Sequence, residues 1–381
     1  MPENKSEIAK NNKPRPWMIL IWVIVFFVVL DIGVRVYFSQ PDLLTRNVAK
    51  GIDALPYLWN QMDRHKGTNV AWVGASVLQG FLNVDNGRTF PDLVERELRK
   101  TDKYADLKGY NLAAAGDNFG DHYCILWETL KHDPDLIVVA IHFKSFSAAM
   151  VEDGPMRRPE LIPLIDDPGK RKIMTKRYQI DTPDFYRYKL TMMLGKPWAF
   201  YRYRNLMVQL ATQESDPPTA QFFQWYKGEM NFISPEAQEV MLNSAEHHST
   251  DYLWKLLPER LISRNHKIAA TLDFTDSNIN WQTFKDMCKL GKKKHAKMLF
   301  YLTPINREFV EAEKFFDWNL LTHYKQAVAR VVQANGHMLV DVTSEVDSAF
   351  FSDTDHINSN GHAQLARRMT YEVQKALERK R

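Results

Sequence analysis

A serine near the start of the chain and an aspartate–histidine pair near its end could together do nucleophilic chemistry. Ser76 follows Gly74 by two residues, directly after the apolar run 69–74, and Asp353 and His356 stand three residues apart in the stretch DTDH. A serine hydroxyl becomes a nucleophile when a histidine accepts its proton and an acid orients that histidine. The pattern predicts acyl transfer with Ser76 as nucleophile, His356 as base and Asp353 as orienting acid. The alternative is that these residues only cap helices or lie buried.

Five short apolar runs should form the sheet that positions these residues, at 69–74, 109–116, 135–143, 297–304 and 337–343. Amphipathic stretches at 90–100, 120–131, 322–334 and 360–379 predict helices. Runs that are apolar on both faces and alternate with helices are typical of a doubly wound parallel α/β sheet. Functional groups gather at the carboxyl ends of such strands, which is where the serine and the DTDH segment both fall.

The order is interrupted over residues 144–294, which contain no comparable run and are rich in Trp, Tyr, Met and basic residues. We expect a large, mainly helical insertion there. Its stretches 186–189 and 199–204 interleave aromatic with basic side chains, which suits stacking on sugars or lying at a membrane interface. The alternative is a packed helical subdomain with solvated arginines.

The N-terminal part of the chain predicts one transmembrane helix over residues 17–38. Residues 17–30 are uninterrupted apolar sequence, and Asp31 and Arg35 are four apart, so they share a helix face and can neutralise each other. A cleaved signal peptide is disfavoured because the bulky sequence VYFSQ replaces the small residues of a cleavage site. The preceding tail, 1–16, carries four cations and should stay in the cytoplasm, which places the rest of the chain outside: Lys5, Lys10, Lys13 and Arg15. Residues 39–68 are a connector that we expect to be helical over 43–62.

Composition excludes several other classes of function. The net charge of +4 arises from 50 basic and 46 acidic residues, so the electrostatic footprint of a nucleic-acid-binding protein is missing. Cys124 and Cys288 are too few for a disulfide framework or a thiolate zinc site, and two buried free thiols are favoured over a single disulfide. Asp353, Asp355, His356 and His362 cluster in sequence, but a hydrolase loop explains Asp353 and His356 better than a metal does, so we expect neither metal nor cofactor.

The motifs around these residues resemble those of the SGNH (GDSL-like) hydrolase superfamily over residues 69–143 and 297–379. The resemblance implies a flavodoxin-like catalytic domain made of 69–143 and 295–381. It also implies that Gly116, in the sequence AGDN after the second strand, donates its backbone N–H to an oxyanion beside the N–H of Ser76. The third motif departs from the family, since His142 and Lys144 stand where Gly and Asn are usual. Three alternatives follow: Lys144 is a charged donor to the oxyanion, the side chain of Asn118 is the third donor, or the oxyanion hole has only two donors.

An anchor together with this altered third motif resembles the accessory acyl-transfer proteins of cell-envelope polymers. Among these are the D-alanine transfer protein of teichoic acid and the alginate O-acetylation proteins, which work beside a membrane-bound O-acyltransferase. The resemblance implies a serine esterase or acyltransferase that acts on an acylated envelope polysaccharide or other polymer. The alternatives are a catalytically weak, membrane-tethered scaffold and a membrane-facing lipase that acts on phospholipid.

Overall fold

A parallel sheet of five strands lies at the centre of the protein, in the order β2-β1-β3-β4-β5. The computed structural model describes residues 16–41, 43, 52–80, 87–152, 154, 156–180, 182–195, 197–213, 253–257, 259–315 and 318–379. The strands are β1 (Asn69–Val73), β2 (Lys108–Asn111), β3 (Leu136–Ile141), β4 (Met298–Leu302) and β5 (Met338–Asp341). They overlap the five predicted apolar runs, and their order is the flavodoxin-like one. The predicted fold class is therefore confirmed.

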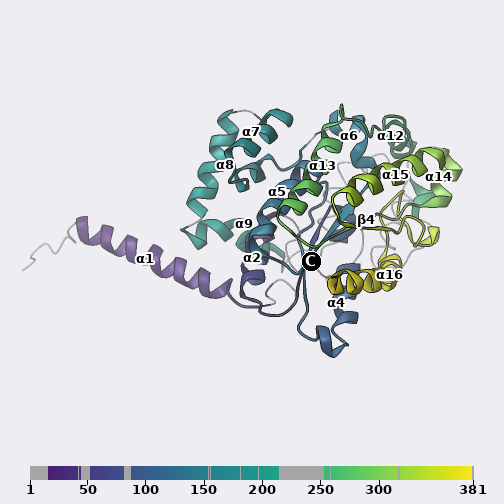
Figure 1. The fold of residues 1–381 in the computed structure, drawn as a ribbon. Helices are drawn as coiled ribbons and strands as arrows, with labels where there is room; N and C mark the ends of the chain where they lie inside the picture. The colour runs from purple at the N-terminus through teal and green to yellow at the C-terminus, as the bar shows by residue number, and fades with distance from the viewer. Residues whose placement is uncertain are drawn as a thin grey trace, which may run out of the picture.

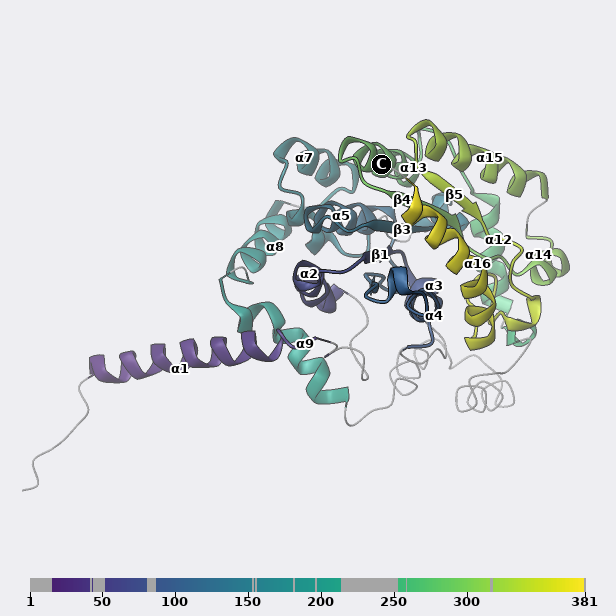
Figure 2. The same ribbon diagram turned by 60° about the horizontal axis from the view of Figure 1, so that its bottom comes forward.

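Helices cover both faces of the sheet (Figures 1 and 2). One layer contains α4 (Phe90–Leu98) and α16 (Ser359–Glu378), and the other contains α5 (Phe119–Thr129), α13 (Ile279–Lys293) and α15 (Trp318–Ala334). The predicted helices 90–100, 120–131, 322–334 and 360–379 overlap α4, α5, α15 and α16. Strands β1 and β3 are buried along their whole length, which is why their sequences are apolar on both faces.

Helices also make up most of the described part of 144–294, as expected. They are α6 (Ala148–Glu152), α7 (Pro168–Arg177), α8 (Thr182–Gly195), α9 (Ala199–Gln213) and α12 (Glu259–Ala270). The remaining short elements are α3 (Ser76–Gln79), α14 (Arg307–Glu313) and 3₁₀ turns at 52–54, 102–104, 130–132, 143–146, 159–164, 253–256 and 348–350. Helix α13 also lies within 144–294, but it packs beside α5 in the layer that covers the sheet.

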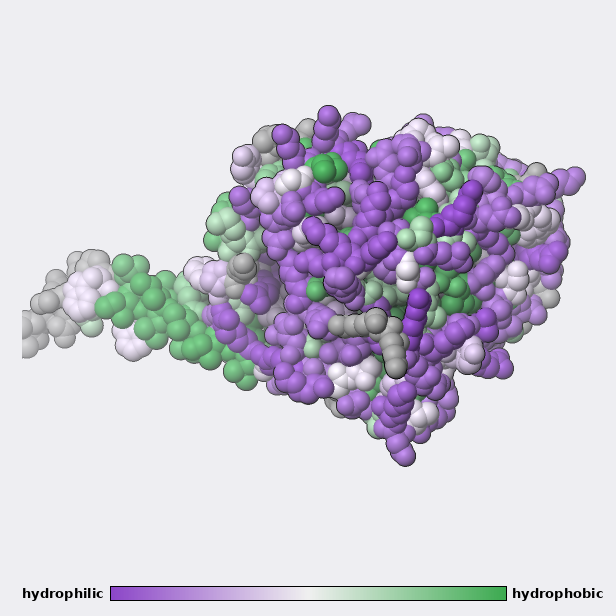
Figure 3. Space-filling view, viewed as in Figure 1, coloured by the Kyte–Doolittle hydropathy of each residue, from purple (hydrophilic) through white to green (hydrophobic). Residues whose placement is uncertain are grey.

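The N-terminal helix α1 (Pro16–Tyr37) projects from the body with its apolar side chains exposed (Figure 3). It is long and apolar enough to cross a membrane. The cationic tail before it lies outside the described residues, as does most of 43–51. Within the connector, the structure describes α2 (Leu55–Arg64), which packs into the core. A second, smaller core joins the end of α1 to α2 and α9, and in it the ring of Phe38 stacks on Tyr203 at 4.3 Å.

The two cysteines are buried and free. Cys124 lies on α5 and Cys288 on α13, and neither forms a disulfide. The expectation of two buried free thiols is confirmed. The main core around them is one continuous cluster of buried side chains from both helical layers and the sheet, and it is rigid enough to fix the loops at the carboxyl ends of the strands.

Candidate active site

The turn after β1 presents Ser76 at the first residue of the short helix α3. Gly74 makes this turn possible, because a Cβ there would lie 2.4 Å from Cδ1 of Leu78 and 2.8 Å from Cβ of Ala140. Only glycine allows the strand end to approach its neighbours this closely. The carbonyl of Ala75 accepts a hydrogen bond from the N–H of Leu78 at 3.0 Å, which closes the turn. Close packing around Gly74 therefore sets the position of the serine hydroxyl.

A β-bridge at its base and hydrogen bonds from Asn306 fix the loop that carries Asp353 and His356. An isolated bridge pairs Phe351 with Ile357 across the base of the loop. Asn306, just beyond β4, donates its backbone N–H to the carbonyl of Thr354 at 2.9 Å and its side-chain amide to the carbonyl of Asp353 at 3.1 Å. The end of one strand thus supports the loop that follows the next one.

These two segments bring Ser76, His356 and Asp353 into one hydrogen-bonded chain. The serine Oγ lies 2.7 Å from Nε2 of His356, and Nδ1 of the same ring lies 2.7 Å from Oδ2 of Asp353. The other oxygen of Asp353 accepts the backbone N–H of His356 at 2.8 Å, so the carboxylate and the ring hold each other in place. A neutral His356 oriented this way carries its proton on Nδ1 and leaves Nε2 free to accept the serine proton.

A second acid lies beside the first. Asp355 is buried, with Oδ2 at 2.9 Å from Nε2 of His142 and at 3.9 Å from Nδ1 of His356. Its Oδ1 forms an ion pair with the ammonium of Lys144 and accepts a hydrogen bond from the hydroxyl of Thr354 at 2.6 Å. The sequence indicated these residues separately, with nothing to connect them. The available signal was a second acid in DTDH and two basic residues after the third strand.

Charge within this cluster shifts two pKa values in opposite directions. Burial disfavours the imidazolium of His356, but the carboxylates of Asp353 and Asp355 outweigh it and raise the pKa of His356 to about 9. Burial likewise disfavours the charged form of Asp355, yet His142 and Lys144 hold its pKa well below the usual range. The result is a carboxylate that stays ionised and a histidine that holds its proton more tightly than an ordinary one.

The predicted oxyanion donors differ in what they contact. Gly116 adopts a φ of +80°, and the N–H of Ala114 in the same loop donates to the carbonyl of Gly74 at 3.3 Å, which ties this loop to the serine turn. The side-chain amide of Asn118 donates to the carbonyl of Gly154 at 2.9 Å, and Lys144 is paired with the second acid. These contacts favour the two-donor alternative, with backbone N–H groups from the serine and from Gly116. The role of each donor stays a prediction.

Two more buried acids, Asp117 and Asp121, follow the Gly116 loop at the start of α5. Asp121 accepts three backbone N–H groups at 2.7–3.1 Å, from Asn118 and from residues 157 and 158, and burial raises its pKa to about 6. Burial and the charge of Asp121 raise the pKa of Asp117 well above its usual range. Asp121 therefore fastens the start of the insertion to the predicted oxyanion loop.

A metal is the remaining chemical alternative for the acidic loop. Oxygens of Asp353 and Asp355 and a ring nitrogen of His356 lie within 4.8 Å of one another. However, Nε2 of His356 faces the serine, its Nδ1 faces Asp353, and Lys144 already pairs with Asp355. A divalent cation would meet a lysine ammonium on one of its ligands, so this donor set fits proton transfer better than metal binding.

No family model and no curated protein matches the chain. The solved structures that are similar to it include an acetyl xylan esterase, an alpha/beta hydrolase from the metagenome of Lake Arreo, Spain, and a mutant of an acetyl-xylooligosaccharide esterase from Geobacillus. Their TM-scores are 0.37, 0.36 and 0.36, at 11%, 10% and 12% identity. The overlaps cover 80%, 84% and 83% of this chain and 99%, 100% and 97% of theirs. At these TM-scores and identities, the chemistry of the chain follows from the site residues themselves.

Proposed function

We propose that this protein is a membrane-anchored serine acyl hydrolase or acyltransferase that acts on ester-linked acyl groups. The observation that carries the proposal is the chain of hydrogen bonds from the hydroxyl of Ser76 through His356 to Asp353, with both distances at 2.7 Å. Side chains from two distant parts of the sequence meet in the order that nucleophilic catalysis requires. A pair of capping residues would not need that order.

The reaction follows from the geometry. Oγ of Ser76 attacks the ester carbonyl while its proton passes to Nε2 of His356, whose imidazolium is stabilised by Asp353. The backbone N–H groups of Ser76 and Gly116 receive the developing oxyanion. His356 then protonates the leaving alcohol, which departs as the C–O bond breaks. Water or a sugar hydroxyl attacks the acyl-serine, and the same histidine takes up that proton and returns it to Oγ. These steps use no cofactor.

The substrate that we propose is an acylated polysaccharide or other polymer of the cell envelope. Support comes from the apolar helix α1 and from the cations before it, which favour an extracytoplasmic catalytic domain. The partner that we propose is a membrane-bound O-acyltransferase that supplies the acyl donor, as in the accessory acyl-transfer proteins that the anchor and the altered third motif resemble. Topology is testable by attaching a thiol label to an engineered cysteine on the domain surface in intact cells.

Labelling with a fluorophosphonate probe tests the nucleophile. We expect wild type to form an adduct located at Ser76 by mass spectrometry, and Ser76→Ala and His356→Ala to form none. Ser359→Ala is the matched control, because Ser359 is likewise the first residue of a helix. Folded wild-type protein without an adduct at Ser76 would contradict the proposal and favour a non-catalytic scaffold. Acyl-ester substrates offered with and without oligosaccharide acceptors then separate hydrolysis from transfer.

A further inference from the structure

Helix α8 carries apolar side chains on two opposite faces. One face packs against the main core through Phe185 and Met192. The opposite face is exposed, and its four large side chains follow the spacing i, i+4, i+7, i+8: Tyr186 at 61%, Leu190 at 57%, Met193 at 60% and Leu194 at 43% exposure. We call these four residues the α8 stripe. A helix that is apolar on both faces is normally buried on both, so the α8 stripe lacks a covering layer among the described residues.

The α8 stripe ends beside the outer end of α1. The segment after α8 contacts α1 directly: the guanidinium of Arg35 bonds the carbonyl of Pro197, and the N–H of Phe200 donates to Asp31 at 3.0 Å. Trp198 lies between these contacts and is 55% exposed. Because a helix rises 1.5 Å per residue, the contacts fall within about 10 Å of the end of α1 at Tyr37.

The orientation of α8 is also informative. Figures 1 and 2 show α8 running across the side of the body from which α1 projects, and Figure 3 shows apolar surface on that side next to the apolar α1. If α1 crosses a bilayer, the side of the body that carries α8 faces the membrane surface. The apolar surface of α1 then continues into the α8 stripe.

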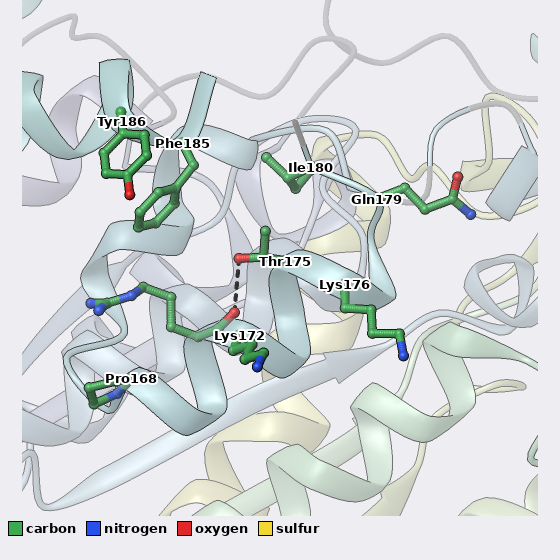
Figure 4. A pocket seen from close by; sticks show the side chains of 9 residues that line it. Pro168, Lys172, Thr175, Lys176, Gln179, Ile180, Phe185 and Tyr186 are labelled. Atoms are coloured by element: carbon green, nitrogen blue, oxygen red, sulfur yellow. Dashed lines mark hydrogen bonds between the residues drawn. The ribbon is translucent and has the colours of Figure 1, made fainter. Parts of the chain in front are cut away.

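Basic side chains flank the same surface. An open pocket of about 530 Å³ lies between α7 and α8, and its lining includes Arg171, Lys172, Lys176 and Tyr186 (Figure 4). None of the nine residues that line it is acidic. Cations placed next to an apolar stripe are the arrangement found in helices that lie at the surface of anionic membranes, where phosphate groups meet the cations and acyl chains meet the apolar side chains.

We propose that α8 lies in the outer interface of an anionic phospholipid bilayer, with the α8 stripe inserted and Lys172 and Lys176 in contact with lipid phosphates. Because the small core already packs α1 against α9, this second contact fixes the tilt of the whole unit and holds the active site in one orientation toward the membrane. The inference rests on the proposal that α1 spans the membrane. It does not depend on catalysis by Ser76.

The test uses the full chain in lipid nanodiscs with an environment-sensitive fluorophore on an engineered cysteine. Leu190→Cys reports on the α8 stripe, and Tyr371→Cys on α16 is the matched control because Tyr371 is 58% exposed. Cys124 and Cys288 are buried and should not label. We expect blue-shifted emission at position 190, with most of it quenched by doxyl-labelled lipids, and neither effect at position 371. Equal behaviour at the two positions would overturn the proposal, and fluorophosphonate labelling reports separately on catalysis.

Charge reversal tests the headgroup contact. Emission from the Leu190→Cys label is compared in phosphatidylcholine nanodiscs with and without phosphatidylglycerol. We expect the anionic lipid to increase quenching, and Lys172→Glu with Lys176→Glu to abolish that increase. The control pair, Lys289→Glu with Lys293→Glu, has the same spacing on an exposed part of α13 and should keep it. Quenching that does not respond to the anionic lipid, or that responds in both pairs alike, would refute the phosphate contact.

Discussion

The rate of catalysis should depend strongly on pH, because the carboxylate of Asp355 adds to that of Asp353 in raising the pKa of His356. His356 acts as a base only when it is neutral, and its pKa of about 9 leaves about one molecule in a hundred in that state at pH 7. Activity must therefore rise with pH. We expect kcat/KM for a neutral ester to increase about 50-fold between pH 7 and pH 9 and to level off above that.

Asp355→Asn isolates the cause of this behaviour. The substitution removes a carboxylate 3.9 Å from Nδ1 of His356 and leaves the hydrogen bond to Asp353 in place. The pKa of His356 should fall, and each unit of that fall raises the activity at pH 7 about tenfold relative to the plateau. The double variant Asp355→Asn with Lys144→Met avoids an unpaired buried lysine and should shift the profile in the same direction.

The assay is the pH profile of kcat/KM for a soluble aryl ester, because this quantity reports pKa values of the free enzyme. Titration of the imidazole nitrogens by NMR gives the same pKa without turnover. A wild-type midpoint near the ordinary histidine value of about 6.5 would refute the reasoning. So would a midpoint that does not move in Asp355→Asn.

Three further substitutions test the framework around the site. Gly74→Ala places a methyl group 2.4 Å from Leu78, so thermal melts should show a loss of about 1–3 kcal/mol, together with weaker fluorophosphonate labelling. Asp117→Asn removes a buried carboxyl whose pKa is raised, and such a group loses its favourable contribution to folding as pH rises through the folded-state pKa. The Tm of the variant should therefore exceed that of wild type at pH 8 but not at pH 4. An equal difference in Tm at the two pH values would contradict this. Phe38→Ala removes the ring that stacks on Tyr203 in the small core. The local stability of that core should fall by about 3–5 kcal/mol, and α9 should become sensitive to limited proteolysis.

Much of the fold and part of the site follow from local sequence. Runs that are apolar on both faces predicted the buried strands, and amphipathic stretches between them predicted α4, α5, α15 and α16. Alternation of the two predicted the parallel sheet, because consecutive parallel strands need a crossover. The same reasoning placed Ser76 and the DTDH loop at one edge of the sheet. Their catalytic roles remain predictions that labelling will decide.

Tertiary structure decided the features that depend on contacts between distant residues. Lys144 and Asp355 pair across 211 positions of sequence, and no local pattern indicates that the altered third motif supplies a counter-ion for a second acid. Burial lowers the pKa of His356 and the carboxylates of Asp353 and Asp355 raise it, and sequence spacing gives neither the burial nor the distance to Asp355. The position of α9 against α1 likewise depends on how Phe38 and Tyr203 pack. Periodicity records which face of an element is apolar, whereas only the folded chain determines what covers that face.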